Sequence, residues 1–284
     1  MTPKAFLKGV MPGLIKGRSR LQRSGLKMSS SRLIKTITYI ILGLLLGMMN
    51  QKTRAETLVE AKRLLECPTP PEVIRALNIY QEHLPEPGSE RFPLLVGLAR
   101  TSYIMGEVTD ETKRKDYFEK GRYYAEKLLQ ERPNSVEGHY WLALNLAGIA
   151  QMSWSDGLVL LPQILEELER AMALDSSYDQ AGPHRVLGRI YYEAPDWPLS
   201  VGDPYKSLHH LKAATDLAPN NTTNHLFLAE TMIRLRLPAQ ARVELEKVFV
   251  ADQHAICKQG IEDDRQRASV LLENSFASVD APKD

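Results

Sequence analysis

The chain has 284 residues, which is enough for a targeting segment and one or two domains. Its formal net charge of +1 conceals an asymmetry, because residues 1–55 contain eleven of the 36 basic residues and none of the 35 acidic ones. Residues 56–284 therefore carry 25 basic and 35 acidic residues, a net charge of −10. This acidic body is not expected to bind nucleic acid, since nucleic-acid-binding proteins neutralise phosphates with Lys and Arg.

The first 55 residues predict a signal peptide or an N-terminal anchor. A basic stretch ends at Lys35, and an uncharged run over residues 36–50 follows it. The run suits the apolar centre of a secretory signal with Ala55 as the last residue removed, and it is short for a membrane span of about 20 residues. A cleaved signal predicts a periplasmic or secreted protein. An inner-membrane anchor through residues 36–50 and a translation start at Met28 are alternatives that stay open.

Taken in chain order, the body predicts helices separated by Pro, Gly and capping residues. Between two pairs of them, residues 151–160 and 193–202 are predicted to be loops longer than the turn of an ordinary helical hairpin. Residues 276–284 are predicted to be a disordered tail. The predicted helices cover residues 57–66, 72–83, 92–105, 111–131, 136–150, 161–174, 181–192, 204–217, 222–235, 239–250 and 260–274.

A repeat of fixed length orders these helices. Pro133, Ser176 and Pro219 each close a helix and lie 43 residues apart. The interval matches a tetratricopeptide hairpin of about 34 residues with about nine residues inserted between its helices. The sequence therefore predicts an all-α solenoid of tetratricopeptide-like helical hairpins, with extended inter-helix loops, over residues 56–275. Small or apolar residues precede each closing residue at steps of three and four: Gly121, Ala125 and Leu128; Ile164, Leu168 and Ala171; Ser207, Leu211 and Ala214.

The motif Leu187-Gly188-x-x-Tyr191 and the repeat positions after it resemble the tetratricopeptide superfamily. Strings within residues 138–145, 185–191, 202–204 and 218–225 resemble the TatT family, the helical T component associated with tripartite ATP-independent periplasmic (TRAP) transporters. This resemblance implies a non-enzymatic periplasmic protein that partners with a solute-binding subunit. The lipid-attachment Cys common in that family is missing here. The eukaryotic regulators of microtubule dynamics are similar in layout, but the bacterial-type signal ranks them below TatT.

The sequence contains no combination of residues typical of an enzyme. Its seven His residues are scattered, and the common zinc, redox, nucleophile and phosphate-binding motifs are missing. His209 and His210 are adjacent on a predicted helix and point in different directions, which makes a poor metal pair. We therefore expect no catalytic residue, no metal and no cofactor. Cys67 and Cys257 are far apart in sequence, so their pairing stays open, with buried unpaired thiols favoured.

A few polar and aromatic residues are candidates for contact with a ligand or a protein partner. An aromatic-plus-amide pair shares one helix face, where it either contacts a ligand or packs inside the solenoid. Two Trp residues lie in the two long loops, where they form either an exposed aromatic rim or the small core of each loop. An Arg on the helix 181–192 either binds an anionic ligand or pairs with Glu, and an Asp is mainly a helix cap. The candidates are His139, Tyr140, Trp141, Asn145, Trp154, Arg189, Trp197 and Asp203.

These features predict a binding protein of the cell envelope. The first hypothesis is a TatT-like scaffold that holds a small hydrophobic or anionic ligand in a groove, docks a periplasmic solute-binding protein, or does both. The alternative is a general protein–protein adaptor with no small-molecule role. An apolar groove would favour ligand carriage, whereas a polar and charged groove would favour a peptide adaptor. A homo-oligomer is left open.

Overall fold

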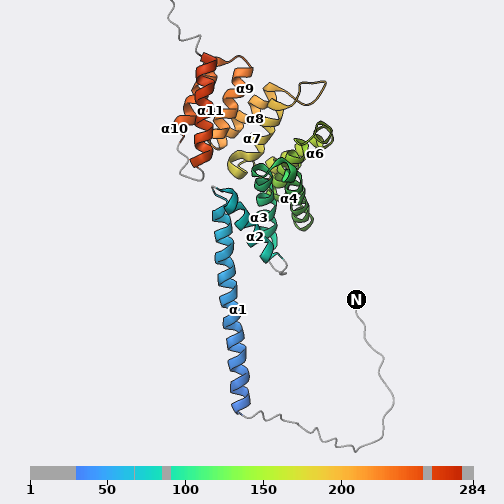
Figure 1. Cartoon of the computed structure of the whole chain (residues 1–284), viewed down its shortest axis with the longest axis vertical. Helices are drawn as coiled ribbons and strands as arrows, with labels where there is room; N and C mark the ends of the chain where they lie inside the picture. The colour runs from blue at the N-terminus through green and yellow to red at the C-terminus, as the bar shows by residue number, and fades with distance from the viewer. Residues whose placement is uncertain (1–29, 67, 85–90, 252–257, 277–284) are drawn as a thin grey trace, which may run out of the picture. The chain divides into compact units, whose positions relative to one another are not determined.

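The computed structural model describes residues 30–66, 68–84, 91–251 and 258–276, in which the regular structure is helical apart from one bridge between Asp196 and Gly202 (Figure 1). The chain divides into two compact units, Met1–Lys52 and Thr53–Asp284. The predictions for Cys67, for Cys257 and for the tail beyond residue 276 lie outside the described residues.

Helix α1 (Ser30–Leu64) supplies the described part of the first unit and continues into the second. The sequence predicted a separate helix from residue 57. That start is wrong, because residues 49–66 contain no Pro or Gly to interrupt the helix. In the described part of the chain, no helix combines the length and apolar character that crossing a membrane requires.

The second unit consists of helical hairpins that follow one another along the chain. Helix α3 packs on α4, α5 on α6, α7 on α8 and α9 on α10, while α11 packs on α9 and α10. This arrangement confirms the predicted solenoid of helical hairpins. The bounds are α2 (Pro70–His83), α3 (Arg91–Val108), α4 (Glu111–Glu131), α5 (Val136–Ala150), α6 (Trp154–Leu174), α7 (Tyr178–Glu193), α8 (Pro204–Leu217), α9 (Thr222–Arg234), α10 (Pro238–Val250) and α11 (Lys258–Phe276).

The repeated small and apolar residues form the contacts between paired helices. The three triplets of the repeat are all buried, so the period seen in the sequence is the period of the core. Gly188 shows why small residues recur, since a Cβ added there would lie 2.5 Å from Leu211 Cγ. Helices α7 and α8 can therefore approach closely only because Gly188 has no side chain.

The two predicted long loops differ in the structure. The loop predicted over residues 151–160 is wrong, because α6 already begins at Trp154. The Ser153 hydroxyl accepts a hydrogen bond from the backbone N–H of Asp156 at 3.1 Å and caps the helix. Pro162 lies inside α6. The loop between α7 and α8 is present, so Trp197 occupies a loop and Trp154 does not.

Candidate functional site

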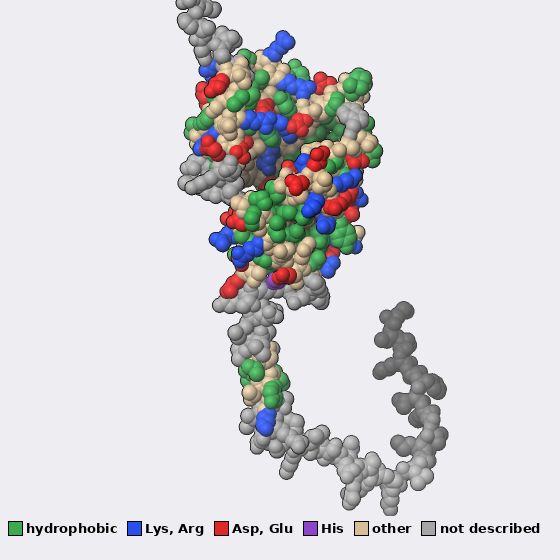
Figure 2. Space-filling view, in the orientation of Figure 1, with side chains coloured by type: hydrophobic (Ala, Val, Ile, Leu, Met, Phe, Trp, Pro, Cys, Tyr) green, Lys and Arg blue, Asp and Glu red, His purple; other side chains and the backbone are tan. Residues whose placement is uncertain are grey.

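The first helices of four hairpins, α3, α5, α7 and α9, line a groove of about 440 Å³. Three basic and three acidic residues share the groove with aromatic ones, so its wall is neither uniformly apolar nor of one charge. Figure 2 shows the same mixture of hydrophobic, acidic and basic side chains over the visible face of the second unit. The groove contains Arg100, Tyr103, Glu107, Tyr140, Trp141, Asp179, Arg185, Arg189, Glu193 and Phe227.

Helix α7 begins with a left-handed turn beside the groove. Asp179, Gln180 and Ala181 have φ values of 49°, 56° and 62°, and none of them is glycine. The left-handed conformation costs an L-residue roughly 1–2 kcal/mol, so three in succession need support from their surroundings. Strained backbone of this kind is typical of binding sites and switch regions.

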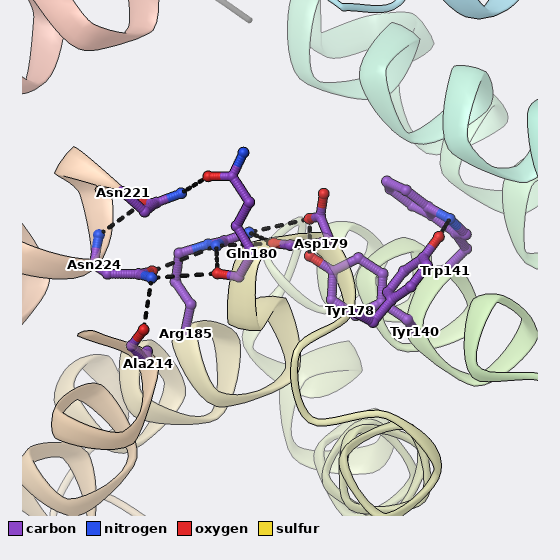
Figure 3. A network of polar contacts seen from close by, with 9 residues as sticks. All are labelled: Tyr140, Trp141, Tyr178, Asp179, Gln180, Arg185, Ala214, Asn221 and Asn224. Carbon is purple, nitrogen blue, oxygen red and sulfur yellow. Dashed lines mark hydrogen bonds and ion pairs between the residues drawn. The ribbon is translucent and has the colours of Figure 1, made fainter. Parts of the chain in front are cut away.

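Arg185 and Asn224 support the turn from two different helices (Figure 3). The Arg185 guanidinium donates to the backbone carbonyls of Asp179 and Gln180 at 3.1–3.2 Å, and it pairs with the Asp179 carboxylate at 3.1 Å. The buried Asn224 amide of α9 donates to Gln180 O at 3.2 Å and to Ala214 O at 3.1 Å. The turn is therefore fixed by contacts between successive hairpins.

Aromatic side chains of α5 meet the same turn. The Tyr140 hydroxyl donates to the Asp179 carboxylate at 2.6 Å, and Trp141 Nε1–H donates to the Tyr178 hydroxyl at 3.1 Å. Burial raises the pKa of Tyr178 to about 12 and also raises the pKa of Tyr140 and Tyr103. These phenols therefore keep their protons near neutral pH, and two of them, Tyr103 and Tyr140, lie in the groove wall.

Arg189 lies in the groove between two carboxylates. It donates to Glu193 and to the buried Glu230, each at 2.5 Å. Its guanidinium also lies 4.4 Å from the centre of the Phe227 ring. The structure thus shows the predicted pairing with Glu, and it holds the guanidinium in a fixed orientation over an aromatic surface.

His139 is buried away from the groove, where it joins α5 to α6. Its Nδ1 lies 2.5 Å from Glu167 Oε2, and its Nε2 lies 2.9 Å from the Pro133 carbonyl oxygen. Both neighbours are acceptors, so both ring nitrogens are committed to internal hydrogen bonds. We call this arrangement the His139 latch.

The same latch recurs two repeat periods later. His225 Nδ1 lies 2.7 Å from Glu244 Oε2, and its Nε2 lies 2.8 Å from the Pro219 carbonyl oxygen. Burial acts to raise the pKa of Glu244, but hydrogen bonds from His225 and Lys247 outweigh it and hold that pKa below its ordinary value. The His therefore serves internal packing in two of the three repeats, since the equivalent position of the middle repeat is Gly182.

Asn145 is fully buried, and its amide donates to the carbonyl oxygens of Ala99 and Trp141 at 3.2 and 2.7 Å. It therefore bonds the neighbouring α3. Asp203 caps α8, since its carboxylate accepts the backbone N–H groups of Tyr205 and Lys206.

The structure describes only one of the two Trp side chains that were predicted to lie in loops. The Trp197 side chain is 84 % exposed on the α7–α8 loop. The Trp154 side chain lies outside the described part of the chain.

Of the eight candidates, the structure brings Tyr140, Trp141 and Arg189 together in the groove. Sequence reasoning missed Asp179 and Arg185, which make the left-handed turn and its support. Arg185 belongs to one of the strings that resemble TatT, and so does Asn224, so a signal existed without an indication of what these residues contact. The sequence offers no such signal for Asp179.

A histidine pair lies between α7 and α8, away from the residues that line the groove. The Nδ1 atoms of His184 and His210 are 3.1 Å apart, with ring centroids at 5.3 Å, and Tyr191 stacks on His210. The two nitrogens face each other, which fits one N–H donating to the other ring. In the described residues, no three His, Cys, Asp or Glu side chains are grouped so that they could hold a metal ion.

This pair predicts a loss of stability in mild acid. Burial, with help from His184 and His209, lowers the pKa of His210 from 6.5 to about 4, and burial also lowers the pKa of His184. The unfolded chain binds the proton more readily, so stability is full above about pH 6.5 and falls as the pH drops towards about 4. We expect His210 to contribute about 1–2 kcal/mol of this loss, since the ring is partly exposed.

Urea unfolding at about pH 7 and about pH 4.5 measures this effect. His210→Gln should reduce the difference in unfolding free energy between the two pH values, whereas His209→Gln, at an exposed position and a smaller cause of the shift, should reduce it much less. If both substitutions changed the difference in unfolding free energy equally, His210 would not be the source of the loss of stability in acid.

A family model described as "Regulator of microtubule dynamics protein 1-3" matches residues 57–199, just over half of the chain. This match reverses the ranking made from the sequence, in which the N-terminal segment placed that family below TatT. The TatT family is not confirmed. The short strings that suggested it lie in repeat positions, and the latch shows that at least one of them, around His139, serves the internal packing of the repeat.

Among solved structures, a thermophilic TPR protein from Thermus thermophilus is similar to this chain. The TM-score is 0.59 at 19 % sequence identity, and the match covers 77 % of this chain and 100 % of that one. At this identity the likeness shows the fold, which is tetratricopeptide-like as predicted. A search among curated proteins found no match.

Proposed function

This chain belongs to the regulator of microtubule dynamics protein 1-3 family, and we propose that it is a non-enzymatic scaffold whose groove binds an extended segment of a partner protein. The observation that carries the proposal is the composition of the groove, with balanced charges and fixed aromatic side chains contributed by four successive hairpins. Repeat proteins use such extended concave surfaces for binding.

The groove suits a peptide for three physical reasons. Its volume of about 440 Å³ accommodates a few side chains at once. The Tyr103 hydroxyl and the Glu107 carboxylate in its wall can hydrogen-bond a peptide backbone, and the partly exposed Phe227 ring offers aromatic contact area. The left-handed turn is already fixed in the free protein, so little ordering is required on binding. A partner that acts on microtubules is the first candidate to test, given the family's description.

A charge placed in the groove should weaken peptide binding. Val186 lines the groove and is partly exposed, so Val186→Glu adds an unpaired carboxylate where an apolar contact is expected. We expect affinity for a peptide selected from a display library to fall at least tenfold, about 1.4 kcal/mol or more, as measured by fluorescence anisotropy.

Val243→Glu on α10 is the matched control, because Val243 is exposed and is not among the groove residues. It should bind the same peptide as the unaltered protein does. Equal losses in the two variants would mean that the peptide does not bind in the groove.

A second candidate is the handling of a small hydrophobic or anionic ligand, as in the TatT-like hypothesis. The groove volume and its three Arg side chains favour it, although Arg185 and Arg189 already pair with carboxylates. On this proposal the N-terminal segment is a signal or anchor, the protein acts in the cell envelope, and a solute-binding protein is the partner. Native mass spectrometry of the purified protein separates the two: a bound small molecule supports the second candidate, and its absence removes that support.

A further inference from the structure

The α7–α8 loop presents two large apolar side chains to solvent. Trp197 is 84 % exposed and Leu199 is 73 % exposed, and they lie two residues apart on the same loop. The loop is held by backbone hydrogen bonds from Gly202 N–H to Pro195 O and from Leu199 N–H to Asp196 O. We call Trp197 and Leu199 the apolar knob.

An apolar pocket of about 420 Å³ lies at the base of the same loop. Helices α5 and α6 contribute Ala150, Leu158 and Leu161, and the loop itself contributes Pro195 and Ser200. Trp197 is not among the lining residues, so the knob does not fill the pocket of its own chain.

The chemistry of the pocket matches an indole ring. Its lining is mostly apolar, and Glu193 is its one charged member in the described part of the chain. A Trp side chain has an apolar body and one N–H donor, which requires an acceptor when it is buried. The Glu193 carboxylate and the Gln151 amide oxygen are acceptors in the wall of the pocket.

We propose that two copies of this chain form a twofold dimer in which each inserts Trp197 into the loop-base pocket of the other. Knob and pocket belong to one surface, so every copy carries both halves of the contact. A twofold interface requires this self-complementarity, because both subunits use the same surface patch. If the knob of the first copy contacts the pocket of the second, the knob of the second also contacts the pocket of the first. The proposal does not depend on what the groove binds, and the pocket and the groove share Gln151 and Glu193 in their walls.

The area involved fits a weak, reversible dimer. A buried aromatic side chain removes roughly 150–250 Å² from water, and Leu199 adds to it. Counting the pocket surface covered and the twofold repetition, the contact stays below about 1,200 Å², in the range of weak and transient encounters. A single contact in one direction would bury about half as much, in the range of crystal-packing contacts.

Sedimentation equilibrium of the full-length chain in a mild detergent tests the proposal. Trp197→Ser removes the knob, and Leu158→Glu puts a charge into the pocket at a half-exposed position. Each variant alone should associate at least tenfold more weakly than the unaltered chain. An equimolar mixture should associate more tightly than either variant alone, because the Leu158→Glu copy still has a knob and the Trp197→Ser copy still has a pocket.

Val250→Ser on α10 is the control for loss of an exposed apolar side chain, since Val250 is 81 % exposed, and it should leave association unchanged. Partial recovery of association in the mixture also shows that both variants are folded, because each must contribute one intact half of the contact. A monomer at every accessible concentration, unchanged association of Trp197→Ser, or a mixture no tighter than its components would each overturn the proposal.

Discussion

Replacing Arg185 by alanine should lower the free energy of unfolding by about 2–4 kcal/mol. The Arg185 side chain is 16 % exposed, and its guanidinium is the donor to two backbone carbonyls and one carboxylate of the left-handed turn. Without it, the Asp179 carboxylate loses its cation and the three left-handed residues lose their main support. The turn is then expected to relax and to change the shape of the groove.

Urea unfolding followed by circular dichroism measures this loss, with Arg170→Ala as the control. Arg170 pairs with Glu166 at 2.5 Å, but both side chains are more than half exposed. Such a pair contributes about 0.3–0.5 kcal/mol, so the control should change little. If the two variants lose the same free energy, the network around the turn does not carry the stability assigned to it.

Replacing His139 by alanine should cost about 3–5 kcal/mol, the largest effect expected of a single substitution in this protein. The side chains of His139 and Glu167 are only 6 % and 10 % exposed, so the substitution leaves a carboxylate with little access to water. It also removes the donor to the Pro133 carbonyl oxygen.

The second latch supplies the comparison. His225→Ala should cost less, because Glu244 keeps a hydrogen bond from Lys247 at 2.8 Å. The double substitution His139→Ala with Glu167→Leu should recover part of the loss, since it leaves no unpaired charge. Equal losses for His139→Ala and His225→Ala, or no recovery in the double variant, would contradict this explanation of the latch.

The sequence contained enough information for the order of helices and for the hairpin architecture. Triplets such as Ser207, Leu211 and Ala214 recur at a fixed interval and are buried where the repeat places them. Capping residues such as Asp203 marked helix starts by local chemistry. These features depend on neighbours within one or two helical turns, which is why they could be predicted.

The candidate site was harder to predict because it depends on contacts between hairpins. The left-handed turn requires Arg185 one turn later and Asn224 from another helix, and no local pattern at Asp179 indicates it. His139 resembled a ligand contact in the sequence, whereas its Glu167 partner lies on the next helix and makes it a packing residue. The start of α6 was misplaced because Ser153, which caps the helix, was assigned to a long loop.

The most direct test of the proposed function is site-specific photo-crosslinking in the cells that produce the protein. A photoreactive residue replaces Val186 in the groove or, as the control, the exposed Val243 on α10. Crosslinks from position 186 to one short segment of a single polypeptide, with none from position 243, are the predicted result. Crosslinks of the same kind from both positions, or none from the groove, would contradict the proposal that the groove binds a partner protein.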